Sequence, residues 1–287
     1  MSTYPNLVYT DAEKFVYYVP EGAGNYGVTP TSPAWLLPGV RSNFENSLDR
    51  SIVKIVPGGS RDVAFFLKGQ KKYGFNLDFH MQDRTFQDLV RTLGSFSLMA
   101  YFLKGATPDV YLHKGCLINR TTVSTGVDNP VDVKTEVISQ ECTIGTTRPS
   151  GSTYVPKTTT PRMWNDSHVT FGTTDINDEG ALTDWSFTIN NNLQRIPVIR
   201  YVNGDQLLYL AERARSITGE LTLAYVTRTF MADVVAMTEA TLNITMNEIG
   251  NFVLGGVAFD LGRYASKPPA EIVNLRLPFT AKTYSIS

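Results

Sequence analysis

The sequence is poor in the residues that usually carry chemistry. Its 287 residues contain two cysteines and three histidines, and 26 lysines and arginines stand against 27 aspartates and glutamates. Cys116 and Cys142 are too few for a disulfide framework and form no C-x-x-C pair, so we expect two free thiols in a protein made in a reducing cytoplasm. Because there is no cationic surplus to neutralise phosphates, the charge disfavours tight DNA binding but permits DNA as a passing cargo.

Long apolar runs are also missing. No stretch approaches the ~20 apolar residues of a membrane helix, and the first residues lack the basic and apolar regions of a signal peptide. Hydrophobic residues make up 42% of the chain and charged residues 18%. These proportions are typical of a folded globular protein, and the length fits one large or two medium domains.

Motifs that would indicate an enzyme are absent or out of context. The segment 22–27 matches the G-x-G-x-x-G fingerprint, but prolines follow it almost at once, so we interpret it as a glycine turn. His80, His113 and His168 show no paired ligand spacing, and no serine lies in a G-x-S-x-G elbow. Acidic residues are spread singly, so no two-carboxylate site is nominated. The sequence therefore predicts no catalytic, cofactor-binding or metal site.

Alternation with a period of two dominates the chain. Apolar and polar residues alternate in the stretches 75–82, 131–137, 185–190, 220–225 and 273–279. Such a pattern gives each strand one dry and one wet face, and it predicts an antiparallel β-protein with solvated sheet faces.

Helical spacing appears in two segments, 84–94 and 228–237, which both begin with Arg-Thr-Phe. In the first, Gly94 suits a C-terminal stop. In the second, Phe230, Val234 and Met237 are expected to share one side of the helix.

The order of the elements repeats along the chain. Gly74 and Gly219 are expected to open equivalent strands, at a spacing of 145 (219 − 74), and the helices follow at a spacing of 144 (228 − 84). A hydrophobic, a glycine-marked and an alternating strand come next in each half, at 96–103, 115–118 and 131–139 and again at 240–246, 255–259 and 271–279. This order predicts a domain duplication. Before each glycine-led strand lies an apolar excursion with central turn signals, at 44–70 and 190–214, which we expect to form protruding hairpins.

Three further segments occur in a characteristic order: 26–35 (YGVTPTSPAW), 115–120 (GCLINR) with the strand end 137–141, and 187–193 with 217–223. Together with the duplication they make the chain resemble, over nearly its whole length, the duplicated-domain tail tube proteins of long-tailed (siphovirus-like) bacterial or archaeal viruses. The resemblance implies a mainly β fold with two tandem tail-tube-type β-sandwich or partial-barrel domains, each with one flanking α-helix.

The same resemblance implies a structural function in the virion tail, with synthesis in the host cytoplasm, and no enzyme. Single-domain relatives form hexameric rings, so a two-domain chain is expected to form a homotrimer with pseudo-sixfold symmetry, whose stacked rings make the tail tube for DNA ejection. If each half lends about four strands, six halves close a β-barrel of roughly 24, wide enough for a channel. Expected partners are the chain itself, the tape measure protein, the tail terminator and the baseplate or tip proteins, with DNA passing through without sequence-specific binding.

We assign the wet strand faces to the lumen, because a conduit should not grip its cargo. The assigned residues are Asn76, Asp78, His80, Asp132, Lys134, Glu136, Ser186, Thr188, Asn190, Glu220, Thr222, Asn274 and Arg276. The two hairpins are assigned to stacking between rings, where burial of apolar side chains would drive polymerisation. Their stacking residues are Ile52, Ile55, Val56, Ile196, Val198, Ile199 and Tyr201.

These assignments divide the chain into an N-terminal arm at 1–35 packed on domain 1 or a neighbour, tube domain 1 at 36–145, a linker at 146–164 and tube domain 2 at 165–287. Two alternatives stay open. One is a related tail terminator or baseplate hub, which forms one ring and no filament. The other, more remote, is a β-rich carbohydrate hydrolase, which needs a cleft with perturbed carboxylates.

Overall fold

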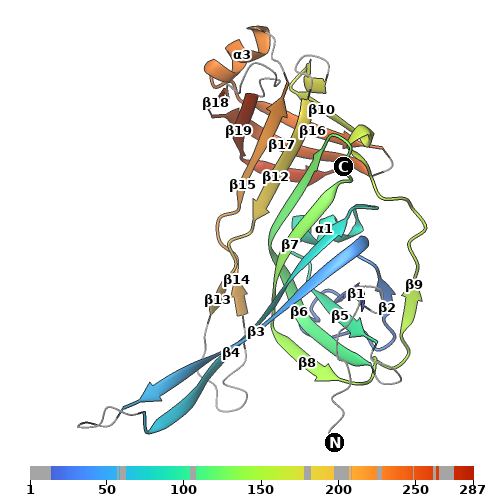
Figure 1. The fold of residues 1–287 in the computed structure, drawn as a ribbon, viewed down its shortest axis with the longest axis vertical. Coiled ribbons are helices and arrows are strands. Elements are labelled where there is room, and N and C mark those ends of the chain that lie inside the picture. Colours follow the sequence, from blue (N-terminus) through green and yellow to red (C-terminus); the bar gives the residue numbers. More distant parts are fainter. Residues whose placement is uncertain are drawn as a thin grey trace, which may run out of the picture.

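The computed structural model describes residues 14–56, 58, 63–103, 108–177, 182–196, 207, 209–224, 228–247, 249–260, 263–264 and 275–287. Within this part of the chain β-strands predominate, which confirms the expected mainly β fold. The molecule is elongated, and the two halves of the chain lie one above the other along its long axis (Figure 1).

The first half contains nine strands and one α-helix among its described residues. In chain order they are β1 (Lys14–Pro20), β2 (Ala34–Leu36), β3 (Val40–Ile55), β4 (Phe65–His80), α1 (Thr85–Thr92), β5 (Phe96–Phe102), β6 (Asp109–Gly126), β7 (Asp132–Ser139), β8 (Glu141–Gly145) and β9 (Thr153–Val155).

The second half follows a short 3-10 helix at Trp164–Asp166. Its elements are β10 (Ser167–Phe171), β11 (Thr174–Asp175), β12 (Leu182–Asn190), β13 (Gln194–Ile196), β14 (Tyr209–Ala211), β15 (Ser216–Leu223), α3 (Arg228–Val235), β16 (Ala240–Met246), β17 (Gly250–Phe259), β18 (Arg263–Tyr264), β19 (Leu275–Ala281) and β20 (Thr283–Ile286).

Both halves use one antiparallel pairing scheme. The first half pairs β1–β5, β5–β6, β6–β8, β6–β7, β4–β7 and β3–β4. The second half pairs, in the same order, β10–β16, β16–β17, β17–β20, β17–β19, β15–β19 and β12–β15. Each strand of one list therefore has an equivalent in the other.

A glycine bulge lets one long strand serve two sheets in each half. Gly115 in β6 and Gly256 in β17 have φ of 59° and 62°, a left-handed conformation that costs glycine little. The β5–β6 and β16–β17 ladders both shift register beside these glycines. Such a bulge bends a strand, so the first part of β6 pairs with β5 and β8 in an outer sheet, and the second part pairs with β7.

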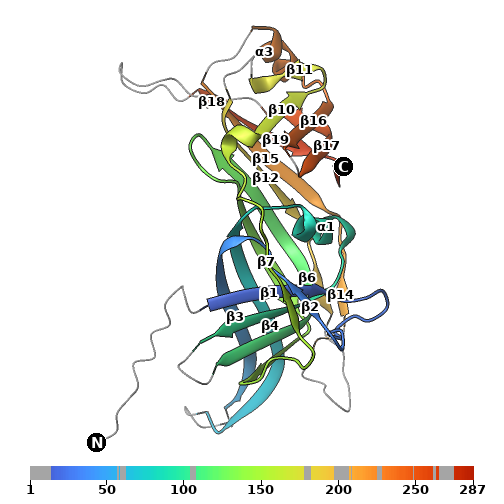
Figure 2. The same ribbon diagram turned by 90° about the vertical axis from the view of Figure 1, so that its right-hand side faces the viewer.

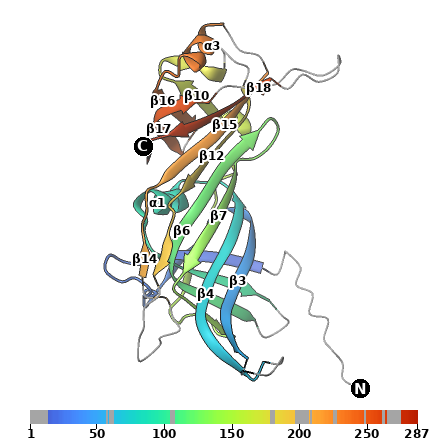
Figure 3. The ribbon, with the colours of Figure 1, turned by 90° about the vertical axis from the view of Figure 1, so that its left-hand side faces the viewer.

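The second part of β6 also pairs with β12, and this ladder joins the two halves. The result is one continuous shared sheet in the order β3-β4-β7-β6-β12-β15-β19-β18. Figure 3 shows its strands side by side from blue to orange, and Figure 2, from the other side, shows the outer sheet of the first half crossing in front of it. Each half is thus a two-layer β-structure that shares its inner layer with the other half.

The predicted alternation is confirmed by burial. Phe75, Leu77 and Phe79 are 0–3% exposed on β4, whereas their neighbours on the other face are accessible. The same holds for Trp185, Phe187 and Ile189, for Leu221 and Leu223, and for Leu275, Leu277 and Phe279. These side chains belong to one buried apolar cluster that runs through both halves.

Both predicted helices are present on the apolar side of the shared sheet, with two differences in detail. Phe86 of α1 packs edge-on against Tyr18, at 5.0 Å between ring centroids. The left-handed residue that ends α1 is Leu93 (φ 50°) and not Gly94. Gly94 instead leaves room for Leu89, whose Cδ2 would lie 3.1 Å from an added Cβ. Met237, expected on the buried side of α3, is 63% exposed.

The two glycines used to align the halves do not open strands, because Gly74 lies inside β4 and Gly219 inside β15. Both positions are too crowded for a side chain: an added Cβ would lie 2.7 Å from Val137 O at Gly74 and 2.4 Å from Ser186 O at Gly219. Crowding inside a sheet therefore explains these glycines better than a turn.

Much of the segment assigned to the N-terminal arm lies within the first half. β1 pairs along its length with β5, and the indole of Trp35 on β2 is fully buried. The glycine turn that follows β1 is held by a buried carboxylate: Glu21 accepts hydrogen bonds from Gly27 N at 2.8 Å, Ser97 Oγ at 2.7 Å and Gly115 N at 2.9 Å. The linker is largely exposed, but β9 within it pairs in parallel with β2.

Candidate functional site

The sequence-predicted lumen residues that the structure describes lie on one face of the shared sheet. On β4 and β7, Asn76 stands opposite Glu136, Asp78 opposite Lys134, and His80 opposite Asp132. On the second half, Ser186 stands opposite Glu220, Thr188 opposite Thr218, and Thr222 opposite Arg276. Directly opposed residues point to the same side of a sheet. Asn274 lies outside the described residues.

A central strip of this polar face went unpredicted. Arg120, Thr122 and Ser124 of β6 stand between Glu136, Lys134 and Asp132 on one side and Asn190, Thr188 and Ser186 on the other. The alternation that would have found them is hidden, because Thr121 and Thr125 on the buried side are polar as well. Thr121 is fully buried and its hydroxyl lies 3.3 Å from that of Thr135.

The polar face is net acidic. Among the positions whose side chains the structure describes, its carboxylates are Glu45, Asp49, Asp78, Asp132, Glu136, Asp184 and Glu220, and its cations are Lys72, Arg120, Lys134 and Arg276. With histidine neutral, seven carboxylates and four cations leave a charge of −3 on these positions. An acidic surface repels phosphates, so this face is poorly suited to bind nucleic acid.

Hydrogen bonds hold several of these polar side chains in place. Asn119 Nδ2 donates to Glu136 Oε1 at 3.0 Å, and Asn76 Nδ2 donates to Glu45 Oε2 at 3.2 Å. His80 Nδ1 lies 2.5 Å from Asp132 Oδ1. Because these partners come from neighbouring strands, the face is a network within the sheet and not a set of free side chains.

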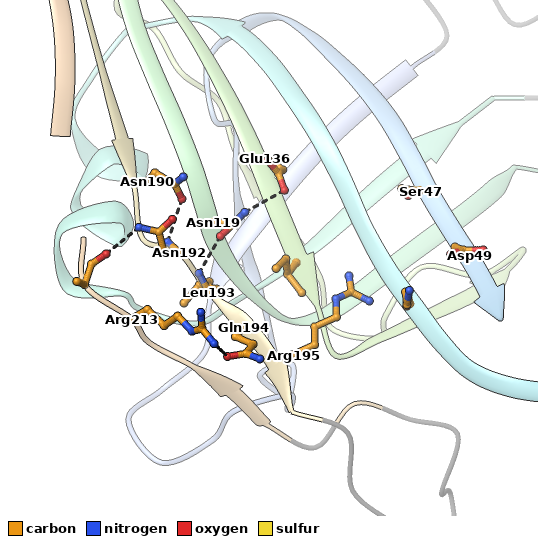
Figure 4. Close-up of a pocket in the computed structure, with 13 residues that line it drawn as sticks. Ser47, Asp49, Asn119, Glu136, Asn190, Asn192, Leu193, Gln194, Arg195 and Arg213 are labelled. Carbon is orange, nitrogen blue, oxygen red and sulfur yellow. Dashed lines mark hydrogen bonds between the residues drawn. The ribbon is translucent and has the colours of Figure 1, made fainter. Parts of the chain in front are cut away.

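An open groove of about 1300 Å³ lies where the polar face meets the second hairpin. Figure 4 shows Asn119, Glu136 and Asn190 on its sheet side, with Arg195 and Arg213 on the hairpin side. Leu193 N donates to Asn119 Oδ1 at 3.0 Å, which ties the start of the hairpin to β6. The lining mixes carboxylates, cations and amides and is open to solvent, which suits a contact between proteins better than a small ligand.

The first predicted hairpin is the long β3–β4 ribbon, which projects from the first half at the lower left of Figure 1. Its stacking residues Ile52, Ile55 and Val56 are 60%, 40% and 51% exposed. The returning strand adds Phe65, Phe66 and Leu67, which are 61%, 66% and 51% exposed. The sequence did not predict them as stacking residues, because a run of apolar residues usually indicates a buried segment. Exposed apolar side chains in one cluster indicate a binding surface.

The second hairpin turns back onto the first half. Leu193 and Leu207 are 9% and 2% exposed and pack with Ile138 of β7, with Leu93 at the end of α1 beside them. Arg195 Nη2 donates to Tyr73 O at 2.6 Å. Ile196 is 40% exposed, and the predicted stacking residues Val198, Ile199 and Tyr201 lie outside the described residues.

The three histidines occupy separate places. Burial lowers the pKa of His113 to about 3, and its Nδ1 lies 2.9 Å from Ser139 Oγ. His168 Nε2 lies 2.7 Å from Asp175 Oδ2 on the second half. In the described part of the chain, no three His, Cys, Asp or Glu side chains converge on a possible metal ion. The helices of that same part are all too short or too polar to cross a membrane.

Comparison with known proteins decides the family. The family model described as phage tail tube protein matches residues 12–281. The chain belongs to the phage tail tube protein family. This membership makes it a structural protein of the virion tail, which assembles with itself and with other virion proteins, and not an enzyme. The carbohydrate hydrolase alternative is therefore wrong.

Two further comparisons do not extend the family assignment. No curated protein matches this tail tube chain. A solved chain titled virion of native gene transfer agent (GTA) particle is similar to it at 12% identity, with 44% of this chain and 98% of that chain covered and a TM-score of 0.37.

Proposed function

We propose that three copies of this tail tube protein form a ring with pseudo-sixfold symmetry, and that stacked rings make the tube through which viral DNA is ejected. The observation that carries the proposal is the shared sheet, which runs unbroken through two halves with one pairing scheme. The common scheme supports a domain duplication, so that each subunit supplies two equivalent sixths of a ring.

The geometry of a closed ring is consistent with a channel. Each subunit supplies the eight strands of the shared sheet, and three subunits supply 24. With strands about 4.8 Å apart and tilted by about 40°, such a barrel is roughly 48 Å across between backbones. The apolar face of the sheet is covered by the outer sheets and helices, so the acidic polar face is left to line the channel.

The β3–β4 hairpin is assigned to contact between rings. Ile55 stands opposite Phe65, and Leu67 lies on the same face two residues further along. Ile52 and Phe66 lie on the other face. A hairpin with accessible apolar side chains on both faces is suited to insertion between surfaces of another ring. The tape measure protein, the tail terminator and the baseplate or tip proteins are the expected partners at the ends and inside the tube.

The test is the assembly state of the purified protein. Electron microscopy should show rings of threefold symmetry that stack into tubes, and mass measurement of the ring should give three chains. A related terminator or hub would give single rings of the same symmetry without tubes. A protein that stays monomeric at high concentration would contradict both.

A further inference from the structure

The shared sheet ends in two edges, β3 on one side and β18 on the other. Within the described residues no strand pairs with the outer side of β3 along residues 45–48, or with the outer side of β18. Lys14 Nζ covers the beginning of the β3 edge, where it donates to Asn43 Oδ1 and Phe44 O, both at 3.2 Å. Unpaired sheet edges are aggregation hazards, and pairing with a strand of another chain is one way to remove them.

The pairing scheme identifies which residues of the two halves are equivalent. Thr122 and Val123 of β6 stand opposite Lys134 and Val133, just as Arg263 and Tyr264 of β18 stand opposite Arg276 and Leu275. Each β18 residue is therefore equivalent to the β6 residue that lies 141 positions earlier in the chain (263 − 122).

The same reasoning relates β3 to β12. Glu45 of β3 stands opposite Asn76 of β4, just as Ser186 of β12 stands opposite Glu220 of β15. Asn76 and Glu220 are 144 positions apart (220 − 76), which is also the spacing of the two helices. Each β3 residue is therefore equivalent to the β12 residue that lies 141 positions later in the chain (186 − 45). Equal offsets on both strands mean that the β6–β12 ladder can be copied onto β18 and β3 without a change of register.

From this equivalence, and resting on the proposed ring, we infer that β18 of one subunit pairs antiparallel with β3 of the next. The register follows from the ladder inside the chain, where Thr122 stands opposite Thr188 and Val123 opposite Phe187. Its copy places Arg263 opposite Ser47 and Tyr264 opposite Asn46 of the neighbouring subunit.

Charge supports this register. Position 263 falls between Glu45 and Asp49 on the neighbouring β3, which lie two residues to either side of Ser47. Diagonal neighbours across an antiparallel pair are about 7–8 Å apart, and opposite charges at such positions stabilise the pairing. A register shifted by one residue would instead place position 263 opposite Asn46 or Leu48, which belong to the other face of β3.

A second exposed feature belongs to the same junction. Leu93 and Met237 are equivalent residues 144 positions apart (237 − 93), and both end a helix with left-handed backbone, at φ 50° and 51°. Leu93 packs with Leu193 and Leu207 of the second hairpin. Met237 is 63% exposed, because within one chain no equivalent hairpin reaches it among the described residues. The base of the β3–β4 hairpin of the next subunit would cover it.

The junction closes a ring when it is repeated. Each subunit offers one β18 edge and one β3 edge, so the contact is head-to-tail, and a head-to-tail contact closes only if the rotation matches. The rotation is already set inside the chain by the β6–β12 junction, which relates one half to the next. Three subunits joined in the same way remove every edge of the shared sheet.

Cysteine cross-linking tests the register. In the full chain with Cys142→Ser, the pair Ser47→Cys and Arg263→Cys should form covalent trimers on mild oxidation, visible on a non-reducing gel. The matched positive control is Thr122→Cys with Thr188→Cys, whose native hydroxyls are 2.8 Å apart and which should cross-link within one chain. The register control, Leu48→Cys with Arg263→Cys, should give about tenfold less covalent trimer, because disulfides need close Cβ atoms.

A second variant tests the helix contact without cysteines. Met237→Asp should leave the monomer folded, because the side chain is exposed, and should reduce the ring fraction at least about tenfold, since it places a charge in an apolar contact. Rings with normal symmetry that show neither the cross-link nor the sensitivity at 237 would overturn the proposed junction and leave the ring itself standing. A wild-type chain that forms no rings would instead overturn the proposed function.

Discussion

The clearest prediction concerns Phe66 on the returning strand of the β3–β4 hairpin. Its side chain is 66% exposed in one subunit, so Phe66→Asp removes little that the folded monomer uses. The free energy of unfolding should change by less than about 0.5 kcal/mol, as is usual for surface positions. Stacking of rings should change far more, because the proposed contact buries the Phe66 side chain against a neighbouring ring of subunits.

The magnitude follows from apolar burial and from the number of hairpins. Burial of a phenylalanine side chain contributes roughly 2 kcal/mol, and a ring of three subunits would bring three hairpins to each interface. The substitution should therefore weaken each ring-to-ring contact by about 6 kcal/mol. Since each 1.4 kcal/mol is a factor of ten, the protein concentration needed for tube growth should rise about 10⁴-fold.

The assay measures tube growth by sedimentation and electron microscopy across a range of protein concentrations, with circular dichroism to confirm the fold. Val155→Asp is the matched control, because Val155 is 42% exposed on β9, on the opposite side of the molecule from the hairpin (Figure 1). Rings should persist in both variants, and tubes only in the control. Tubes of Phe66→Asp at the wild-type concentration would refute the role of the hairpin in stacking.

Four further experiments test the rest of the structure. Ile55→Asp, on the other face of the same hairpin, should also block stacking and leave soluble rings, and normal tubes would show that this face is not used. Asp184→Lys with Glu136→Lys adds four charges to the polar face, from −3 to +1, so assembled tubes should bind duplex DNA at low salt and release it as salt rises; DNA binding equal to wild type would mean that this face does not line the lumen. Glu21→Ala leaves three donors without their acceptor and should lower the free energy of unfolding by about 2–4 kcal/mol in urea titrations, whereas Glu239→Ala, which breaks a surface ion pair, should cost less than about 1 kcal/mol. His113 has a folded pKa of about 3, below the ordinary 6.5, so the unfolded chain binds the extra proton and stability is lost as pH falls from 6.5 toward 3. Between pH 7 and pH 5 this residue should account for about 2 kcal/mol, and a His113→Gln variant with the same pH dependence as wild type would contradict the assignment.

Local pattern alone determined a large part of the fold. Alternation placed Phe75, Leu77 and Phe79 on the buried face of β4 and their neighbours on the polar face, because side-chain direction in a strand depends only on residue parity. The helices followed from their 3.6-residue spacing, and the resemblance to tail tube proteins followed from the order of short segments. The alternation and the helical spacing are each contained within a few consecutive residues, and the resemblance needs only the order of such segments along the chain.

Tertiary structure decided what depends on partners far away in sequence. Arg120, Thr122 and Ser124 could not be assigned, because Thr121 and Thr125 pack inward as polar residues and hide the alternation. The apolar run Phe65–Leu67 reads as buried in sequence, but it lies on a ribbon that extends beyond the body of the first half. Met237 and Leu93 have the same local pattern, and they differ in exposure because a hairpin from the second half reaches only Leu93 among the described residues. The ladder between β6 and β12 likewise joins residues about 60–70 positions apart, so no local signal specifies it. That ladder makes one sheet of two halves, and only the folded chain reveals the two edges left for the next subunit.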